Sequence, residues 1–193
     1  MPAPDFDAYH RRVSRAATET DTAPTDAQRE AGNYKAGTVH FHGLTVKIEY
    51  PKGSVRSGTG PGGKKWSRIM KAHYGRIKRT TGLDGDPVDV FLGDHPSSQL
   101  AFVISQLTAD GDLDEHKTVL GVRNGAEARK VYLAHYPDGW ADERMGEVRG
   151  MFMPDFKKWL KTDNPVKART KKAEYDEAPD PLVGLTAILK GRS

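Results

Sequence analysis

Three aspartates, Asp84, Asp86 and Asp89, lie within the short segment DGDPVD that begins at position 84. Carboxylates this close repel one another unless cations neutralise them. Magnesium accepts carboxylates together with retained waters and the oxygens of a substrate phosphate. The spacing therefore indicates a site for hard divalent ions. A simple turn is the alternative interpretation, because Asp-Gly and Asp-Pro are favoured turn pairs.

A second acidic group follows in the segment DGDLDE at positions 110–115. It resembles the start of a calcium-binding EF-hand loop, but the pattern fails at two positions. Glu115 stands at the sixth position, where that loop needs glycine, and Gly121 stands at the twelfth, where a bidentate glutamate is needed. The segment is instead predicted to be a loop between two strands that brings further carboxylates to the first cluster, forming one site for several metal ions.

Basic and acidic residues are separated along the chain, although the net charge is only +4. The stretch 50–83 contains nine basic residues and no acid: Lys52, Arg56, Lys64, Lys65, Arg68, Lys71, Arg76, Lys78 and Arg79. The stretch 84–115 contains eight acids and neither lysine nor arginine. Folding one block onto the other would join cations for phosphate oxygens to carboxylates for metal ions. Two solvated faces are the alternative.

A glycine-rich loop is predicted at residues 53–63, just before Lys64 and Lys65. Its sequence GTGPGGKK meets the spacing of a phosphate-binding Walker A loop as far as the first lysine. Lys65 then replaces the Ser or Thr whose hydroxyl would bind magnesium. A nucleotide-binding loop of this class is therefore not expected, but the loop can still carry Lys64 or Lys65 to a phosphate group.

Short segments rich in branched and aromatic residues occupy the middle of the chain. Strands are predicted at residues 38–42, 44–49, 88–92, 101–107 and 118–122, and helices at 5–17, 126–135 and 154–161. This pattern predicts an α+β fold, with a small β-barrel and flanking helices. We interpret residues 1–31 as a partly helical N-terminal arm, 32–163 as the barrel domain, and 164–193 as a basic, proline-containing C-terminal tail.

The composition limits the chemistry and the location that can be expected. The 193 residues include no cysteine, so a metal would be held by oxygen or imidazole groups and no thiol nucleophile is available. No apolar run reaches the ~18–20 residues that span a bilayer. The first residues also lack the apolar stretch of a secretory signal. We therefore expect a cytoplasmic protein with no membrane partner.

The run LDGDPVDV at residues 83–90, with Tyr74-Gly75 upstream of it, resembles the signature region of family I soluble inorganic pyrophosphatases. The resemblance covers residues 32–159. It implies hydrolysis of inorganic pyrophosphate with Mg2+ as cofactor and Mn2+ as a substitute ion. It also implies a five-stranded OB-like barrel flanked by two or three helices.

The same resemblance assigns roles to individual residues. The metal-binding counterparts are Glu49, Asp84, Asp89, Asp110 and either Asp114 or Glu115, and the catalytic and substrate-binding counterparts are Asp86, Tyr74, Lys117, Arg56, Lys64 and Lys157. Asp86 would be the general base. Lys64 competes with Lys65 and Arg68 for its role, because the glycine-rich loop disturbs the register there. Phe156 precedes Lys157 where the family often has tyrosine, so that hydroxyl is missing.

The wider runs GNYKAG, GLTVKIEYPKGSVRSG, KKW and DEHK are similar to pyrophosphatase-like domains of phages and mobile elements. This similarity implies the host cytoplasm or association with a virion, and a homo-oligomer or a phage protein assembly. The main alternative function is a catalytically silent barrel that serves as a phage structural, assembly or nucleic-acid-binding module. Nucleic acid is not favoured, because such a module needs no paired acids. A two-metal nuclease is a third hypothesis.

Overall fold

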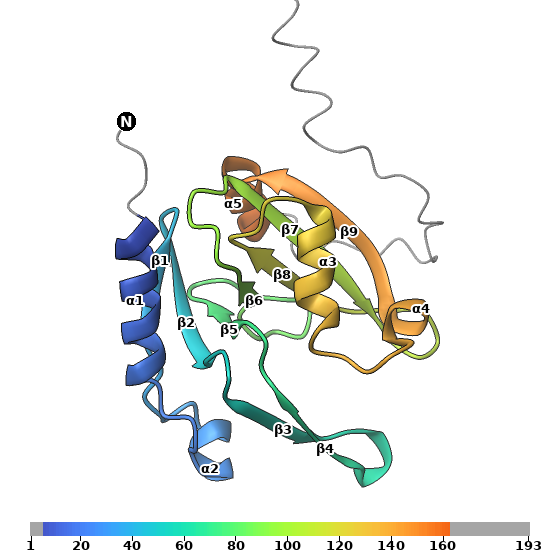
Figure 1. Cartoon of the computed structure of the whole chain (residues 1–193). Helices are drawn as coiled ribbons and strands as arrows, with labels where there is room; N and C mark the ends of the chain where they lie inside the picture. The colour runs from blue at the N-terminus through green and yellow to red at the C-terminus, as the bar shows by residue number, and fades with distance from the viewer. Residues whose placement is uncertain (1–5, 163–193) are drawn as a thin grey trace, which may run out of the picture.

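The computed structural model describes residues 6–162, and its central element is a seven-stranded mixed sheet (Figure 1). The strands follow the order β1-β2-β5-β6-β8-β7-β9. They are β1 (Thr38–Phe41), β2 (Leu44–Tyr50), β5 (His73–Ile77), β6 (Asp89–Leu92), β8 (Leu113–Leu120), β7 (Leu100–Leu107) and β9 (Met145–Phe152). Neighbouring strands are antiparallel except β6 and β8, which are parallel.

Two further strands, β3 (Val55–Thr59) and β4 (Lys65–Ile69), form a separate hairpin (Figure 1). The 3-10 turn η1 (Pro61–Gly63) joins them, and Gly62 has a φ of 73°, which glycine adopts without steric cost. The prediction of a plain loop at residues 53–63 is therefore wrong. Side chains of β3 alternate between exposed and half-buried, so the segment lacks the apolar alternation of a buried strand.

Helices precede and follow the strands. They are α1 (Phe6–Glu19), α2 (Asp26–Glu30), α3 (Gly125–Leu133), α4 (Trp140–Arg144) and α5 (Met153–Thr162). Helix α2 begins with a capping box formed by Thr25 and Gln28. Helix α3 begins after Asn124, whose side chain accepts a hydrogen bond from the amide of Glu127. Both caps satisfy amide groups that the first turn of a helix leaves unpaired.

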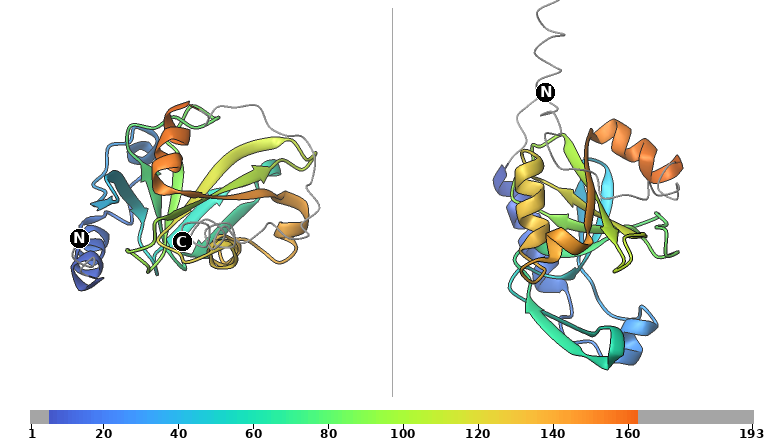
Figure 2. Two further views of the ribbon diagram at one scale, coloured as in Figure 1. Left: turned by 90° about the horizontal axis from the view of Figure 1, so that it is seen from above. Right: turned by 90° about the vertical axis from the view of Figure 1, so that its right-hand side faces the viewer.

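The sheet separates two apolar cores, because successive side chains of a strand point to opposite faces. Val90 and Leu92 of β6 belong to the core that also contains residues of α1 and α5. Phe91 belongs to the other core, together with Tyr132 of α3. Figure 2 accordingly shows α3 and α5 on opposite sides of the strands. Asp89 shares the face of Phe91, so it lies on the α3 side of the sheet.

Helix α1 is part of the packed body. Its Tyr9, Val13 and Ala16 are at most 5% exposed and belong to the core shared with α5. Gly37 permits this packing, because a Cβ atom there would lie 1.9 Å from the carbonyl oxygen of Ala16. An arm outside the core is therefore the wrong description of α1. The proposed domain boundaries stay predictions, and the predicted tail at 164–193 lies outside the described residues.

The seven-stranded sheet is not closed into a barrel. Its order is open, with β1 and β9 at the two ends. The predicted α+β class is confirmed, but the five-stranded OB-like barrel is not. Local patterns reveal a strand, whereas closure depends on strand tilt and on register between distant segments. Within residues 6–162, no helix has the length and apolar character needed to cross a membrane.

Candidate active site

A buried lysine joins two acids and a tyrosine on the α3 side of the sheet. The Lys117 ammonium group contacts the Asp89 carboxylate and lies 2.6 Å from Glu115 Oε2. It also donates to the Tyr74 hydroxyl oxygen over 3.1 Å, and that hydroxyl donates to Asp89 Oδ2 over 2.5 Å. We call these four residues the Lys117 cluster. The Lys117 side chain is 5% exposed, against 24% for Asp89 and 21% for Glu115, so the carboxylates lie closer to solvent.

Three neighbouring strands position the Lys117 cluster. Tyr74 lies on β5, Asp89 at the start of β6, and Glu115 and Lys117 on β8. Asp89 is the register partner of Lys117 in the parallel pair, and Glu115 shares the face of Lys117 because it lies two residues before it. The predicted loop at 110–115 is thus only partly correct, since β8 already begins at Leu113.

Burial and charge act in opposite directions on the Lys117 cluster. Burial alone lowers the pKa of Lys117, but its interactions with the tyrosine and the two acids raise that pKa well above its ordinary value. Burial raises the pKa of Glu115, and the positive charge of Lys117 opposes this shift. Burial also raises the pKa of Tyr74. At neutral pH Lys117 is therefore a cation and Tyr74 a neutral hydrogen-bond donor.

Gln106 on β7 links the Lys117 cluster to α3, and it was not among the residues predicted from the sequence. Its Nε2 donates to Glu115 Oε1 over 2.7 Å and to Asp114 Oδ2 over 3.3 Å. Its Oε1 accepts hydrogen bonds from the hydroxyls of Tyr132 and Tyr136, over 3.0 and 2.9 Å. The only signal for Gln106 is its register opposite Glu115, which the linear sequence does not reveal.

The β3–β4 hairpin places Arg56 beside the Lys117 cluster. The guanidinium carbon of Arg56 lies 4.4 Å from the ring centre of Tyr74 and 5.2 Å from that of Tyr50. Burial alone lowers the pKa of Arg56, but interactions with Tyr74 and Asp89 help to raise it overall. The predicted phosphate ligand is therefore a charged, stacked group next to the acids.

Arg68 on β4 stacks between two further aromatic rings. Its guanidinium carbon lies 4.2 Å from the ring centre of Trp66 and 5.0 Å from that of Tyr136. It also donates to the carbonyl oxygen of His135. Burial raises the pKa of Tyr136 to about 12. Lys64, Lys65 and Arg68 were the three candidates for a second phosphate ligand. Arg68 contacts Tyr136, which neighbours the Lys117 cluster through Gln106, whereas Lys64 and Lys65 are exposed.

Asp84 and Asp86 lie in the turn that leads from β5 to β6. Both are exposed, and Asp84 Oδ1 accepts a hydrogen bond from the amide of Asp86 over 3.1 Å. Gly85 between them has a φ of 88°. The turn interpretation therefore describes these two residues, while Asp89, three residues later, joins the Lys117 cluster.

The other predicted acids lie apart from Lys117. Asp110 is exposed in the turn between β7 and β8, and Asp114 is exposed although it accepts the Gln106 hydrogen bond. Glu49 on β2 lies 2.8 Å from Arg76 Nε and accepts a hydrogen bond from Tyr34 over 3.1 Å. Because Arg76 is the register partner of Asp89, Glu49 lies beyond Arg76 on the next strand.

Lys157 is not brought to the Lys117 cluster. It lies on α5, which packs against the opposite core through Phe156. Its Nζ is 3.2 Å from the position that a Cβ atom of Gly43 would take, near the turn between β1 and β2. The role of Lys157 in phosphate binding stays a prediction.

The acids near Lys117 match the chemistry of a hard divalent ion. Asp89, Glu115 and Asp114 offer carboxylate oxygens, which magnesium prefers over nitrogen or sulfur. Among residues 6–162, however, no three acidic or imidazole side chains gather closely enough to enclose a metal ion. The donors therefore fit magnesium in kind, while the expected convergence of several carboxylates is not seen.

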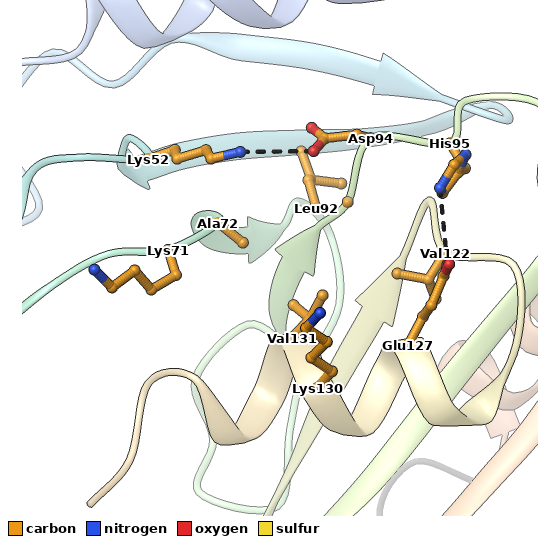
Figure 3. Close-up of a pocket in the computed structure, with 11 residues that line it drawn as sticks. Lys52, Lys71, Ala72, Leu92, Asp94, His95, Val122, Glu127, Lys130 and Val131 are labelled. Carbon is orange, nitrogen blue, oxygen red and sulfur yellow. Dashed lines mark ion pairs between the residues drawn. The ribbon is translucent and has the colours of Figure 1, made fainter.

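A cavity of about 210 Å³ lies elsewhere, between α3, the end of β6 and the segment before β5 (Figure 3). None of the predicted site residues lines it. On its rim, Lys52 Nζ lies 3.6 Å from Asp94 Oδ2, and His95 Nε2 lies 3.8 Å from Glu127 Oε2. Figure 3 shows the Lys71 ammonium group pointing away from both pairs. Four titratable side chains of the rim thus form two pairs, and Lys71 and Lys130 are the other two that line the cavity.

His135 ties the end of α3 to the segment before β5. Its Nε2 accepts hydrogen bonds from the amides of Lys71 and Ala72, over 2.9 and 3.2 Å. Its Nδ1 lies 2.7 Å from the carbonyl oxygen of Val131. Two donors at Nε2 and an acceptor at Nδ1 require the neutral ring with its proton on Nδ1. Burial lowers the pKa of His135 accordingly.

We expect the free energy of unfolding to decrease as the pH falls below about 6.5, the ordinary pKa of histidine. Because the pKa of His135 is lowered in the folded state, the unfolded chain takes up the proton first. The stabilisation from neutral His135 is therefore fully present above the pKa that His135 has in the unfolded chain. It is lost as the pH falls from there to the pKa that His135 has in the folded protein. Urea unfolding between about pH 5 and 8 tests this. A His135→Gln variant should show a shallower dependence on pH, and an unchanged slope would contradict the assignment.

The comparison with protein families identifies the chain. Residues 26–161, more than half of it, match the model of the family described as Inorganic Pyrophosphatase. The chain belongs to the inorganic pyrophosphatase family. The resemblance carried by the motif at residues 83–90 is thereby confirmed. The closer similarity of this pyrophosphatase-family chain to phage-borne domains stays a prediction.

Two solved structures are similar to this pyrophosphatase-family chain. An inorganic pyrophosphatase from Coxiella burnetii shares 15% identity, over 66% of this chain and 94% of its own, with a TM-score of 0.34. An inorganic phosphatase from Anaplasma phagocytophilum shares 14% identity, over 61% of this chain and 87% of its own, with a TM-score of 0.30. These scores are too low to support conclusions about the site. No curated protein matches the chain.

Proposed function

We propose that this protein hydrolyses inorganic pyrophosphate to two phosphates with the help of magnesium ions. The observation that carries the proposal is the Lys117 cluster, in which a cation and two carboxylates meet, with Arg56 stacked beside it. Membership of the pyrophosphatase family supports the same reaction. The site combines cations for phosphate oxygens with oxygen donors for a hard divalent ion.

The cationic side chains would bind the substrate. Pyrophosphate is a polyanion, and charge-assisted hydrogen bonds from Arg56 and Lys117 suit its oxygens. Arg56 is already held against Tyr74, so it needs little reorientation when charge moves to the leaving phosphate. Lys117 would exchange part of its contact with the two carboxylates for contact with a phosphoryl oxygen.

The acids would prepare the attacking water. Its oxygen attacks one phosphorus atom while the bond from that phosphorus to the bridging oxygen breaks, releasing the second phosphate. We assign Asp86 as the general base that accepts the proton of this water. Asp84, Asp89 and Glu115 would hold the divalent ions, and Glu49, Asp110 and Asp114 stay further predictions. When bound, the ions lower the pKa of water and offset the charge of the phosphoryl oxygens.

The aromatic residues near the site support a small substrate over a strand of nucleic acid. Single-stranded nucleic acids stack their bases on free aromatic faces. Here Tyr74 carries the guanidinium group of Arg56, while Trp66 and Tyr136 carry that of Arg68. For this reason a silent module that binds nucleic acid is the alternative function and not the favoured one. The cytoplasmic location, a homo-oligomer and a phage assembly stay predictions.

Phosphate release by the full-length protein tests the proposal. We expect magnesium-dependent release from pyrophosphate at a turnover on the order of 10 s⁻¹, weaker support by manganese, and none with a chelator. Samples with single-stranded DNA or p-nitrophenyl phosphate distinguish a nuclease or a general phosphatase. A well-folded protein that releases no phosphate from pyrophosphate with either ion would refute the enzymatic function and favour the silent module.

A further inference from the structure

The side-chain amide of Gln106 uses all of its hydrogen-bonding capacity. It is 8% exposed, and each half of the amide makes two hydrogen bonds. Nε2 donates to Glu115 and Asp114, and Oε1 accepts from Tyr132 and Tyr136. A primary amide has two protons to donate and two lone pairs to accept with. The observed orientation of the Gln106 amide therefore satisfies all of its donors and acceptors.

The orientation of this amide is set by its neighbours. The Tyr132 hydroxyl oxygen accepts a hydrogen bond from Trp140 Nε1 over 3.0 Å, so its proton is directed at Gln106. On the other side, Glu115 offers only acceptor oxygens when ionised. A flipped amide would place its oxygen against that carboxylate. The tyrosine pair and the acid therefore both require Nε2 to face Glu115.

The two oxygens of Glu115 are held by different partners. Oε1 accepts from Gln106 Nε2 over 2.7 Å, and Oε2 lies 2.6 Å from Lys117 Nζ. A carboxylate held at both oxygens cannot rotate without losing one of these contacts. Asp114 receives only the longer bond of 3.3 Å and is exposed. The same amide thus distinguishes between two adjacent acids that the sequence left equivalent.

We propose that Gln106 is a positioning residue that holds the Glu115 carboxylate against Lys117 and so selects Glu115 over Asp114 as the acid of the site. The inference rests on the proposed function for its kinetic consequences, but not for its structural one. Gln106 connects Glu115 to an aromatic group formed by Tyr132, Tyr136 and Trp140. The ring centres of Tyr136 and Trp140 are 4.5 Å apart, and the two rings are stacked. Residues that hydrogen-bond to a metal-binding side chain and orient it contribute about 10–100-fold to metal affinity or activity.

The test compares Gln106→Met with Gln99→Met in the full-length protein. Methionine keeps the length of glutamine without its hydrogen bonds, and Gln99 is an exposed glutamine before β7. We expect Gln106→Met to lower kcat by about 10–100-fold, with a matching rise in the magnesium concentration for half-maximal activity. KM for pyrophosphate should change much less. Gln106→Glu should behave at least as badly, because it places a second carboxylate against Glu115.

Crystal structures of the wild type and of Gln106→Met give a readout that does not depend on activity. We expect the Glu115 carboxylate to turn away from Lys117 in the variant. A carboxylate that keeps its place there would overturn the proposal, as would kinetics equal to those of Gln99→Met. If the wild type lacks pyrophosphatase activity, the proposed function fails, while these structures still decide the role of Gln106.

Discussion

Replacing Lys117 with methionine is expected to lower the rate of pyrophosphate hydrolysis by about 100-fold or more. Methionine retains the length and the apolar contacts of the side chain but not the ammonium group. Asp89 and Glu115 would lose the cation between them, and the substrate would lose a donor to its phosphoryl oxygens. Phosphate release by the purified variant, at saturating magnesium, measures this effect.

The same variant is expected to be less stable by about 3–5 kcal/mol when no divalent ion is present, because removing one partner of a buried ion pair leaves charge uncompensated. Magnesium is expected to recover part of this loss, since an ion that binds only the folded state stabilises it. Urea unfolding with magnesium and with a chelator separates the two contributions. This recovery would link the acids of the Lys117 cluster directly to ion binding.

Lys161→Met is the matched control for this substitution. Lys161 is an exposed lysine in the last turn of α5, and its replacement should change neither the activity nor the stability by much. If Lys117→Met behaved like Lys161→Met in both measurements, the buried ion pairs of Lys117 would be unimportant. The Lys117 cluster could then not be the active site.

The variants Asp89→Ala and Asp86→Ala are both expected to lose activity, but they are expected to differ in their free energy of unfolding. Each should lower turnover by about 10²–10⁴-fold, the usual contribution of a group that transfers a proton or prepares the water. Asp89→Ala removes the acceptor for Tyr74 and Lys117, so it should destabilise the protein by about 1.5–3 kcal/mol. Asp86 is exposed, and its replacement should change the stability by about 0.5 kcal/mol or less.

Asp112→Ala is the control, because Asp112 is an exposed acid in the turn between β7 and β8 with no predicted role. It should retain full activity. Full activity of Asp86→Ala would remove Asp86 as the general base, whereas full activity of Asp89→Ala would exclude the Lys117 cluster as the site. Phosphate release and urea unfolding of the same preparations distinguish a chemical defect from an unfolded protein.

The strands that were predicted best are those with a buried, apolar pattern. Predicted segments 38–42, 44–49 and 101–107 coincide with β1, β2 and β7 to within a residue at either end, because the alternation or run of apolar residues is a local property. The predicted segment 118–122 overlaps only the last three of the eight residues of β8 and extends two residues past its end. The first part of β8 carries Asp114, Glu115 and His116, and these polar residues resemble a loop. Of the three, Glu115 belongs to the Lys117 cluster.

The sequence by itself determined the chemistry that is available and the family to which it belongs. The spacing of Asp84, Asp86 and Asp89, the absence of cysteine and the separation of basic from acidic residues are all local features. They favoured oxygen ligands, hard ions and a phosphate substrate without any knowledge of the fold. They could not rank Asp114 against Glu115, since adjacent acids of one segment have the same local pattern.

Only the tertiary structure decided which of these groups meet. The parallel pairing of β6 with β8 joins Asp89 to Lys117, which lies 28 positions away, and the antiparallel pairing of β7 with β8 sets Gln106 opposite Glu115. Strand register is a long-range property, and a shift of one residue would turn each side chain to the other face. The positions of the acids, the buried lysine and the glutamine therefore follow from hydrogen bonds between strands that no local pattern records.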